Sequence, residues 1–159
     1  MTLSSKDVVQ KFYSAFERKD AEAMAALYAP EATFSDPAFA NLNAKDAGDM
    51  WRMLLSKADE NFKIVVSNVK GDGDNGSAHW EATYKFGPKR RDVVNKIDAS
   101  MVIQNGKIVK HVDSFDFYTW SKQALGMPAY LFGWMGWFQT KVRAGALENL
   151  KKWQKSQSG

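Results

Sequence analysis

The sequence predicts an α+β fold, in which helices near the N-terminus pack on one face of an antiparallel sheet. Apolar residues recur every three or four positions up to about residue 55, and from residue 62 the period changes to two. Turn-forming sequences divide the second region into strands at about 62–69, 77–86, 93–104 and 107–117. Helices followed by a run of neighbouring strands is the order typical of this fold class.

Length and composition indicate a single soluble domain. The 159 residues are enough to bury a core, and 45% hydrophobic and 25% charged residues are ordinary for a globular protein. The absence of cysteine excludes disulfides and thiolate metal sites. The first residues carry no apolar signal-peptide region, and the uncharged aromatic stretch 130–138 is far shorter than the roughly 20 residues of a membrane span. We therefore expect a cytoplasmic location.

Three N-terminal helices are expected, each preceded by a side chain that can cap it. Ser4 or Ser5 precedes the first, Asp20 the second and Asn43 the third. The stretch 32–37 between the second and third helices is β-rich and ends in Asp-Pro, which favours extended backbone. We expect a short strand there that ends at a turn.

The C-terminal segment is expected to be one amphipathic helix from residue 128 to about residue 155. Its apolar residues recur at helical spacing: Leu131, Trp134, Phe138, Val142, Leu150 and Trp153. We therefore divide the chain into an α+β domain at 1–127 and a helical extension of the same domain at 128–159.

The basic balance of the chain belongs to this extension. Residues 139–159 carry five basic residues and one acidic residue, which accounts for the formal net charge of +4. Basic residues confined to one segment argue against a nucleic-acid partner, which needs them along a binding face. The aromatic residues of the extension can belong to the core or a dimer contact, close a pocket as a lid, or touch a membrane surface through 130–155.

The strongest candidate site is a hairpin around Asn105-Gly106, a sequence typical of two-residue turns. With such a turn, Asp98 faces Asp113 across the hairpin. All side chains in register with them share one face, because side chains alternate along a strand. Like charges directly opposite each other destabilise a sheet, so this placement points to function. A bulge at the turn would shift the register by one residue and separate the pair.

The chemistry of this pair depends on its burial. Two buried carboxylates cannot both ionise easily, which would make one an acid and the other a base. Phe115 and other apolar neighbours of Asp113 favour burial, whereas a solvated face with water and Lys96 neutralising the charges is the alternative. His111, in register with Ser100, is either a base or donor or else a histidine satisfied within the core.

The two faces of the 93–103 strand differ, and this difference leads us to expect a homodimer. One face is mixed: Lys96, Asp98, Ser100 and Val102. The other face is apolar: Ile97, Ala99, Met101 and Ile103. If the helices cover the mixed face with its candidate site, the apolar face stays exposed unless a second subunit buries it.

Three stretches of the chain resemble the nuclear transport factor 2-like superfamily, in particular its SnoaL-like and ketosteroid isomerase-like branch. They are Val-Gln-Lys-Phe-Tyr-Ser-Ala-Phe at 9–16 followed by Asp20, Leu-Tyr-Ala-Pro-Glu-Ala-Thr-Phe-Ser-Asp-Pro at 27–37, and Gly-Lys-Ile-Val-Lys-His-Val-Asp at 106–113. The resemblance covers about residues 4–120. It implies a cone: a strongly bent mixed or antiparallel sheet wrapped around three helices, with an apolar pocket and usually a dimer.

Resemblance to ketosteroid isomerases implies roles for three residues. Asp36 falls where these enzymes place the proton-shuttling base, although by its own sequence context it is simply a turn residue before proline. Asp98 falls where they place the protonated acid of the oxyanion hole. The tyrosine of that hole falls on Phe12, which has no hydroxyl to donate.

Two other relatives imply different roles. In limonene epoxide hydrolases the catalytic aspartates match Asp98 and Asp113. The arginine that bridges them falls on Lys96, whose ammonium group cannot form the two parallel hydrogen bonds of a guanidinium. The SnoaL-like cyclases imply acid/base work by His111 and Asp113. The superfamily also holds many binding proteins without activity, and fold alone does not choose between them.

We therefore expect a protein that binds a small hydrophobic ligand and acts as a cofactor-independent acid/base enzyme of isomerase, cyclase or epoxide-hydrolase type. Asp98, Asp113, His111 and Asp36 would carry the chemistry, with no metal. The residues expected to line the pocket are Phe12, Phe16, Trp51, Trp80, Tyr84, Lys96, Ser100 and Phe115. The alternative is a ligand-binding or protein-interaction module with the same pocket and no turnover.

Overall fold

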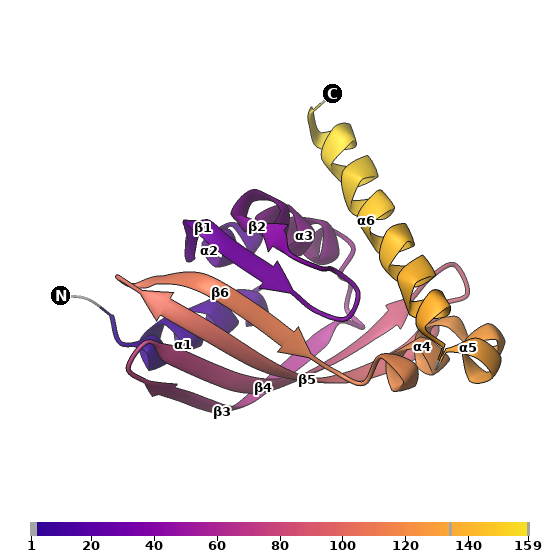
Figure 1. The fold of residues 1–159 in the computed structure, drawn as a ribbon, viewed down its shortest axis with the longest axis horizontal. Coiled ribbons are helices and arrows are strands. Elements are labelled where there is room, and N and C mark those ends of the chain that lie inside the picture. The colour runs from indigo at the N-terminus through magenta and orange to yellow at the C-terminus, as the bar shows by residue number, and fades with distance from the viewer. Residues whose placement is uncertain (1–2, 134, 159) are drawn as a thin grey trace.

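A single six-stranded sheet organises the molecule in the computed structural model, which describes residues 3–133 and 135–158 (Figure 1). The strands are β1 (Tyr28–Ser35), β2 (Leu42–Asn43), β3 (Lys63–Asp72), β4 (Asn75–Phe86), β5 (Arg91–Gln104) and β6 (Lys107–Ser114). Their order is β2-β1-β6-β5-β4-β3, and neighbours are antiparallel except β1 and β6, which run parallel. The sheet is strongly bent around the N-terminal helices, so the predicted α+β cone is confirmed.

Three helices lie inside the bend, and their starts are those that the sequence predicts. They are α1 (Ser5–Glu17), α2 (Ala21–Ala26) and α3 (Ala44–Ser56). The caps are Ser4, Asp20 and Asn43, whose side-chain oxygens accept the backbone N–H of the residue three positions ahead at 3.1, 3.0 and 2.8 Å. These bonds satisfy donors that a helix start leaves open.

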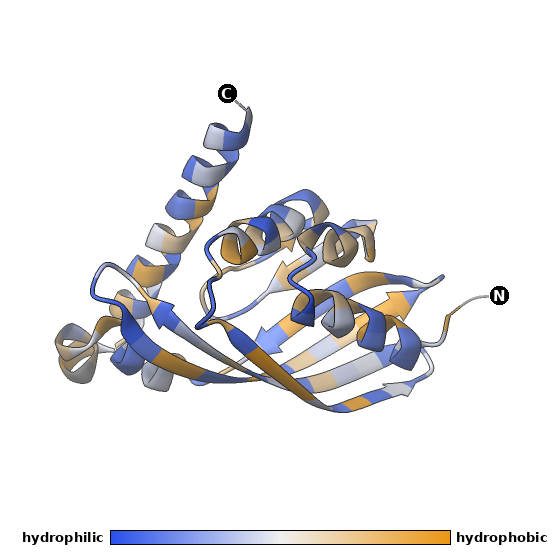
Figure 2. Cartoon of the chain, turned by 180° about the vertical axis from the view of Figure 1, so that it is seen from behind, coloured by the Kyte–Doolittle hydropathy of each residue, from blue (hydrophilic) through white to orange (hydrophobic). Residues whose placement is uncertain are grey.

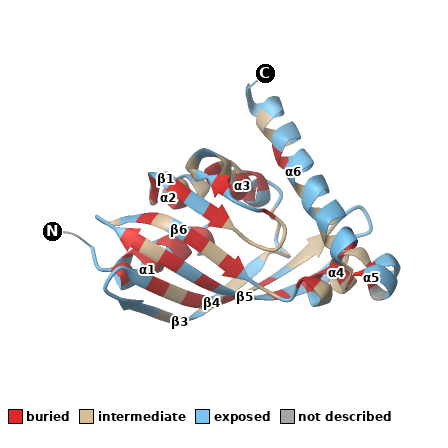
Figure 3. Ribbon diagram, viewed as in Figure 1, coloured by how far each residue is buried: buried red, intermediate tan, exposed pale blue. Residues whose placement is uncertain are grey.

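Aromatic side chains fill the interior between the helices and the sheet. Phe16 of α1 lies edge-on to both Trp51 of α3 and Trp80 of β4, with ring centroids 5.1 Å apart in each pair. Phe12 and Phe34 are fully buried beside them. Burial of this apolar area is the main favourable term in folding. Figure 3 shows buried residues along the strands and on the helices inside the bend.

The apolar face of β5 is the face that the helices cover. Ile97, Ala99 and Met101 are buried against the core, whereas Lys96 and Asp98 are exposed on the outer face. The prediction that the helices cover the mixed face is therefore wrong, and so is the reason given for a second subunit. Figure 2 shows the same alternation of apolar and polar residues along the strands. Helices bury the face that costs least to remove from water.

The described residues of the C-terminal part form three helices rather than the single one predicted. They are α4 (Phe117–Leu125), α5 (Met127–Phe132) and α6 (Gly136–Ser158). α4 is capped by Asp116, whose Oδ1 accepts the backbone N–H of Thr119 at 3.1 Å, so β6 ends at Ser114 instead of 117. Trp134, expected on the apolar stripe, lies outside the described residues.

These C-terminal helices build a second apolar cluster and then return to the N-terminal helices. Phe117 and Trp120 of α4 and Phe138 of α6 pack around Val93 of β5. Further along α6, Leu150 is buried in the main core. Gln154 Nε2 donates to carboxylates of Asp46 and Asp49 in α3 at 2.8 and 2.9 Å. Across the described residues, no helix combines the length and apolar character that crossing a membrane requires.

Gly71 and Gly145 give opposite predictions for an added methyl group. A Cβ at Gly71 of β3 would clash with the backbone nitrogen of Lys6, so Gly71→Ala should destabilise the fold by about 1–3 kcal/mol. A Cβ at Gly145 of α6 meets nothing within 4 Å, so Gly145→Ala should stabilise by roughly 1 kcal/mol through helix propensity. Urea unfolding of both variants checks this. Equal stabilities would contradict the close approach of β3 to α1.

Candidate functional site

A β-bulge one step beyond the predicted turn decides which carboxylate enters the interior. Asn105 and Gly106 both have positive φ, at 55° and 76°, and Gln104 pairs with Lys107 as the predicted turn requires. The next pairs are Ile103 with Ile108 and Val102 with Lys110, which leaves Val109 as an extra residue. Such a bulge shifts the register of every later pair.

The bulge separates the two aspartates of the expected pair. Asp98 is opposite Ser114, and Asp113 is opposite Ala99. Asp113 points inward and is 3% exposed, whereas the Asp98 side chain is 81% exposed on the outer face. Asp98 Oδ1 lies 2.9 Å from His79 Nδ1 there. The predicted Asp98–Asp113 pair is therefore wrong, and the exposed Lys96 and Ser100 lie on the outer face with Asp98.

A chain of hydrogen bonds crosses the buried interior and ends at Asp113. Trp51 Nε1 donates to Tyr28 Oη at 3.0 Å. Tyr28 Oη lies 2.8 Å from His111 Nδ1, and His111 Nε2 lies 2.8 Å from Asp113 Oδ1. His111 is fully buried, so this chain links α3, β1 and β6 inside the aromatic core.

The two ends of this chain fix the direction of its outer hydrogen bonds. Indole N–H can only donate, so Tyr28 Oη accepts from Trp51. An ionised carboxylate can only accept, so His111 Nε2 carries a hydrogen and donates it to Asp113 Oδ1. The Tyr28 hydroxyl and both ring nitrogens of His111 therefore have partners, as buried polar groups require.

Asp36 lies directly after β1, beside the end of β6. Because β1 and β6 are parallel and Ser35 pairs with Val112, the residues that follow both strands emerge at the same edge. Asp36 Oδ1 accepts the backbone N–H groups of Ala38 at 2.7 Å and Phe39 at 2.6 Å. The second oxygen, Oδ2, accepts no hydrogen bond within the described chain.

The pKa of Asp36 is raised from its ordinary value of 3.8 to about 6. Burial is the main cause, because removing a carboxylate from water disfavours its charged form. The backbone N–H of Phe39 opposes this rise, and the negative charge of Asp113 adds to it. Asp36 therefore changes its protonation state close to neutral pH.

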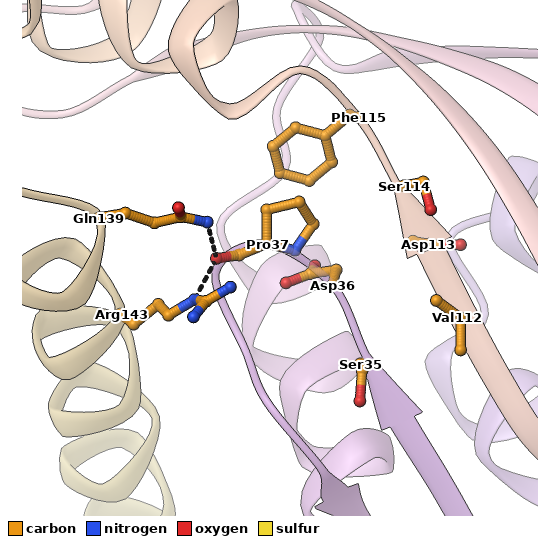
Figure 4. A pocket seen from close by; sticks show the side chains of 9 residues that line it. All are labelled: Ser35, Asp36, Pro37, Val112, Asp113, Ser114, Phe115, Gln139 and Arg143. Atoms are coloured by element: carbon orange, nitrogen blue, oxygen red, sulfur yellow. Dashed lines mark hydrogen bonds between the residues drawn. The ribbon is translucent and has the colours of Figure 1, made fainter. Parts of the chain in front are cut away.

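A cavity of about 310 Å³ opens at this edge, between the ends of β1 and β6 and the helix α6 (Figure 4). Its lining residues are Ser35, Asp36, Pro37, Val112, Asp113, Ser114, Phe115, Gln139 and Arg143. The two residues from α6 both reach the Pro37 carbonyl oxygen, Arg143 Nε at 2.7 Å and Gln139 Nε2 at 3.4 Å. Neither was expected from the sequence, because both contacts join positions more than a hundred residues apart.

The predicted aromatic lining is mostly core. Phe115 lines the cavity, but Phe12, Phe16, Trp51 and Trp80 are packed against one another in the interior. Close packing of large rings, which the sequence pattern cannot distinguish from a cavity wall, fills the space they were expected to surround.

Tyr84 lies between the two apolar clusters. It is half-buried and packs against both of them, as does Phe115. Tyr84 Oη accepts a hydrogen bond from Trp120 Nε1 at 2.9 Å. Burial raises the pKa of Tyr84 to about 12, and the charge of Asp36 adds to the rise. Its hydroxyl therefore stays protonated near neutral pH and is a donor, not a base. Within the described parts of the chain, no three His, Asp or Glu side chains converge as metal ligands.

The bent mixed sheet, the enclosed helices and the polar residues at the ends of β1 and β6 define an NTF2-like fold. The SnoaL-like domain model matches residues 9–111, so the chain belongs to the SnoaL-like family of this superfamily. The resemblance drawn from the sequence is thereby confirmed. The match ends before Asp113 and before α4, α5 and α6, so Gln139 and Arg143 belong to a part of the chain outside it.

Solved structures with the same fold share little sequence with this chain. An NTF2-like protein of unknown function from Burkholderia pseudomallei has a TM-score of 0.66 and 16% identity, covering 77% of this chain and 99% of its own. An LEH-like epoxide hydrolase from M. tuberculosis has a TM-score of 0.59 and 18% identity, covering 83% and 98%.

A further similar structure is a protein with a ketosteroid isomerase-like fold from Catenulispora acidiphila in complex with trimethylamine. It has a TM-score of 0.64 and 16% identity, covering 77% of this chain and 95% of its own. A comparison with curated proteins found no relative. Identities this low establish the fold and leave the activity open.

The raised pKa of Asp36 makes folding stability depend on pH. The folded state holds the Asp36 proton up to about pH 6 and the unfolded state only to about 3.8, so this stabilisation is present at low pH. It is lost as the pH rises through that interval. Asp36→Asn should therefore match the wild type near pH 3.5 and exceed it at pH 7, by roughly 1–3 kcal/mol.

Urea unfolding of both proteins from pH 3.5 to 7.5 gives this difference directly. Asn keeps the oxygen that accepts from Ala38 and Phe39, so the local turn is preserved in the comparison. A difference in stability that does not change with pH would contradict the burial of the Asp36 carboxyl.

Proposed function

We propose that this protein is an acid/base enzyme that moves a proton on a small, largely apolar molecule, with Asp36 as the base. The observation that carries the proposal is the Asp36 carboxyl on the cavity wall with a pKa of about 6. A base of that pKa is mostly ionised at pH 7, and its conjugate acid can still return the proton. Perturbed carboxyls beside a cavity are typical of catalytic sites.

The two oxygens of Asp36 have different roles in this proposal. Oδ1 is held by the N–H groups of Ala38 and Phe39, which fixes the orientation of the carboxyl. Oδ2 accepts nothing from the described chain and is the atom that would take the proton. The charge of Asp113 strengthens Asp36 as a base, and His111 holds Asp113 in place through a hydrogen bond of 2.8 Å. Asp98 has no part, because it lies on the other face of the sheet.

The cavity supports a small substrate with both apolar and polar parts. Its volume of about 310 Å³ is at the lower end of the range of ligand pockets. Pro37, Val112 and Phe115 give the wall its apolar surface. Isomerisation and cyclisation need only a proton removed from one atom and returned to another. Epoxide opening, the activity named for the M. tuberculosis neighbour, would instead use Asp36 to activate water.

A binding module without turnover is the alternative function. The observation that favours it is the packed aromatic interior, which leaves the cavity outside the core that Phe12, Phe16 and Trp51 fill. The indole N–H of Trp51, the hydroxyl of Tyr28 and both ring nitrogens of His111 are already paired, as in a structural network. In this alternative Asp36 would accept a hydrogen bond from a ligand and transfer nothing.

Asp36→Asn is expected to lower the kcat of the reaction at least 100-fold, because the amide cannot accept a proton. The assay uses a panel of a β,γ-unsaturated ketone, an aryl epoxide and a poly-β-ketone, followed by chromatography. For the substrate turned over, kcat/KM should fall below pH 6 as Asp36 becomes protonated.

Asp98→Asn is the matched control, since it makes the same chemical change at an exposed aspartate outside the cavity. It should retain full activity. Equal activity of Asp36→Asn and the wild type would contradict the proposed base. Binding of the panel members with no turnover by the wild type would support the binding module instead.

A further inference from the structure

The cavity has two walls of opposite chemical character. The ends of β1 and β6 contribute the carboxyls Asp36 and Asp113, which accept protons or hydrogen bonds. The opposite wall comes from α6 and contributes Gln139 and Arg143, one helical turn apart on the same face (Figure 4). The α6 wall lies outside the residues that match the SnoaL-like domain. It is therefore a property of this chain's own C-terminal helix.

Arg143 is held in place by one of its nitrogens while the others are left available. Its Nε donates to the Pro37 carbonyl oxygen at 2.7 Å, directly beside Asp36. Neither Nη atom makes a hydrogen bond or an ion pair with any residue that the structure describes. A guanidinium is planar and always charged, so fixing Nε also fixes the direction in which the Nη donors point.

We propose that Arg143, assisted by Gln139, binds a carbonyl oxygen of the substrate and stabilises the negative charge that this oxygen acquires. This inference rests on the proposed function, in which Asp36 is the base. It narrows the substrate to an apolar ketone or a similar carbonyl compound with a hydrogen on the adjacent carbon.

The proton transfer needs no reactant other than the substrate and Asp36. Asp36 Oδ2 takes the proton from the carbon next to the carbonyl group, and the electron pair of that C–H bond forms a carbon–carbon double bond. The carbonyl π electrons move to the oxygen, which becomes an enolate beside the Arg143 guanidinium. Asp36 then returns a proton to a carbon of the enolate system, either the one it took or one that it has exchanged with water. Fixed cationic donors are most effective where charge develops in this way.

Charge on the two walls excludes other classes of ligand. A carboxylate would bind Arg143 but meet the negative charges of Asp36 and Asp113 across the cavity. An ammonium group would be attracted by the carboxyls and repelled by Arg143. A neutral carbonyl compound avoids both repulsions, with its C–H toward Asp36 and its oxygen toward α6.

The test compares 2-indanone with indane, which has the same ring system without the oxygen. Dissociation constants of both are measured by NMR for the wild type, Arg143→Met and Lys141→Met. The wild type should bind the ketone about tenfold more tightly than the hydrocarbon, in line with a charge-assisted hydrogen bond. Arg143→Met should lose this preference. Lys141→Met removes an exposed charge two positions away outside the cavity and should keep it.

A second readout follows exchange of the α-hydrogens of 2-indanone with D2O. The wild type should accelerate exchange, Asp36→Asn should abolish the acceleration, and Arg143→Met should reduce it by about 10²–10³-fold. Arg143→Lys keeps the positive charge but loses the planar pair of Nη donors, so its exchange rate should lie between those of the wild type and Arg143→Met. Thermal unfolding of each variant confirms that it is folded.

Each failure has a distinct meaning. Exchange that needs Asp36 but is unchanged in Arg143→Met would overturn this inference and leave the proposed function standing. Exchange that is unchanged in Asp36→Asn would overturn the proposed function itself. A preference for indane, or binding of neither probe, would overturn the carbonyl assignment, while the titration of Asp36 continues to test its role as the base.

Discussion

The structure depends on burying a carboxylate and an imidazole within an aromatic core without leaving either unpaired. A buried polar group without partners costs several kcal/mol, and a buried charge costs more. The chain from Trp51 through Tyr28 and His111 to Asp113 meets this requirement only if α3, β1 and β6 keep their relative positions. The same constraint holds the ends of β1 and β6 together and so places Asp36 beside Asp113.

The C-terminal helix completes the site from the other side. The first turn of α6 packs into the second apolar cluster through Phe138, and Gln154 near its other end contacts α3. The helix passes the cavity between these two contacts. This path delivers Arg143 to the Pro37 carbonyl, next to the base. The SnoaL-like part of the chain thus supplies the carboxyl Asp36, and the extension supplies the cation opposite it.

Local features of the fold could be predicted from the sequence, whereas the strand register could not. Helix caps such as Ser4 and Asn43, and the turn at 105–106, depend on neighbouring residues alone and were predicted correctly. The bulge at Val109 has no local sequence signature. Both Val109 and Lys110 suit a regular strand, so the sequence does not show which residue is left without a partner on β5. This one extra residue in β6 turns Asp113 to the inner face, whereas Asp98 lies on the outer face of β5.

The candidate site could likewise be predicted only in part. Asp36, His111, Asp113 and Phe115 were selected by residue type and resemblance, and the structure brings them together at one edge of the sheet. Gln139 and Arg143 could not be selected, because an exposed polar residue on a helix has no pattern that reveals a contact more than a hundred positions away. The end of α5 before α6 could not be predicted either, because the apolar residues keep their helical spacing across it.

The most direct test of the account is a carbon-13 NMR titration of the Asp36 carboxyl in the wild type and in Asp113→Asn. We expect a pKa of about 6 for Asp36 in the wild type. In the variant we expect a lower pKa, because the neighbouring negative charge is gone, yet one still above 3.8, because the carboxyl stays buried. A pKa near 3.8 in both proteins would show a solvated carboxyl and contradict its role as the base.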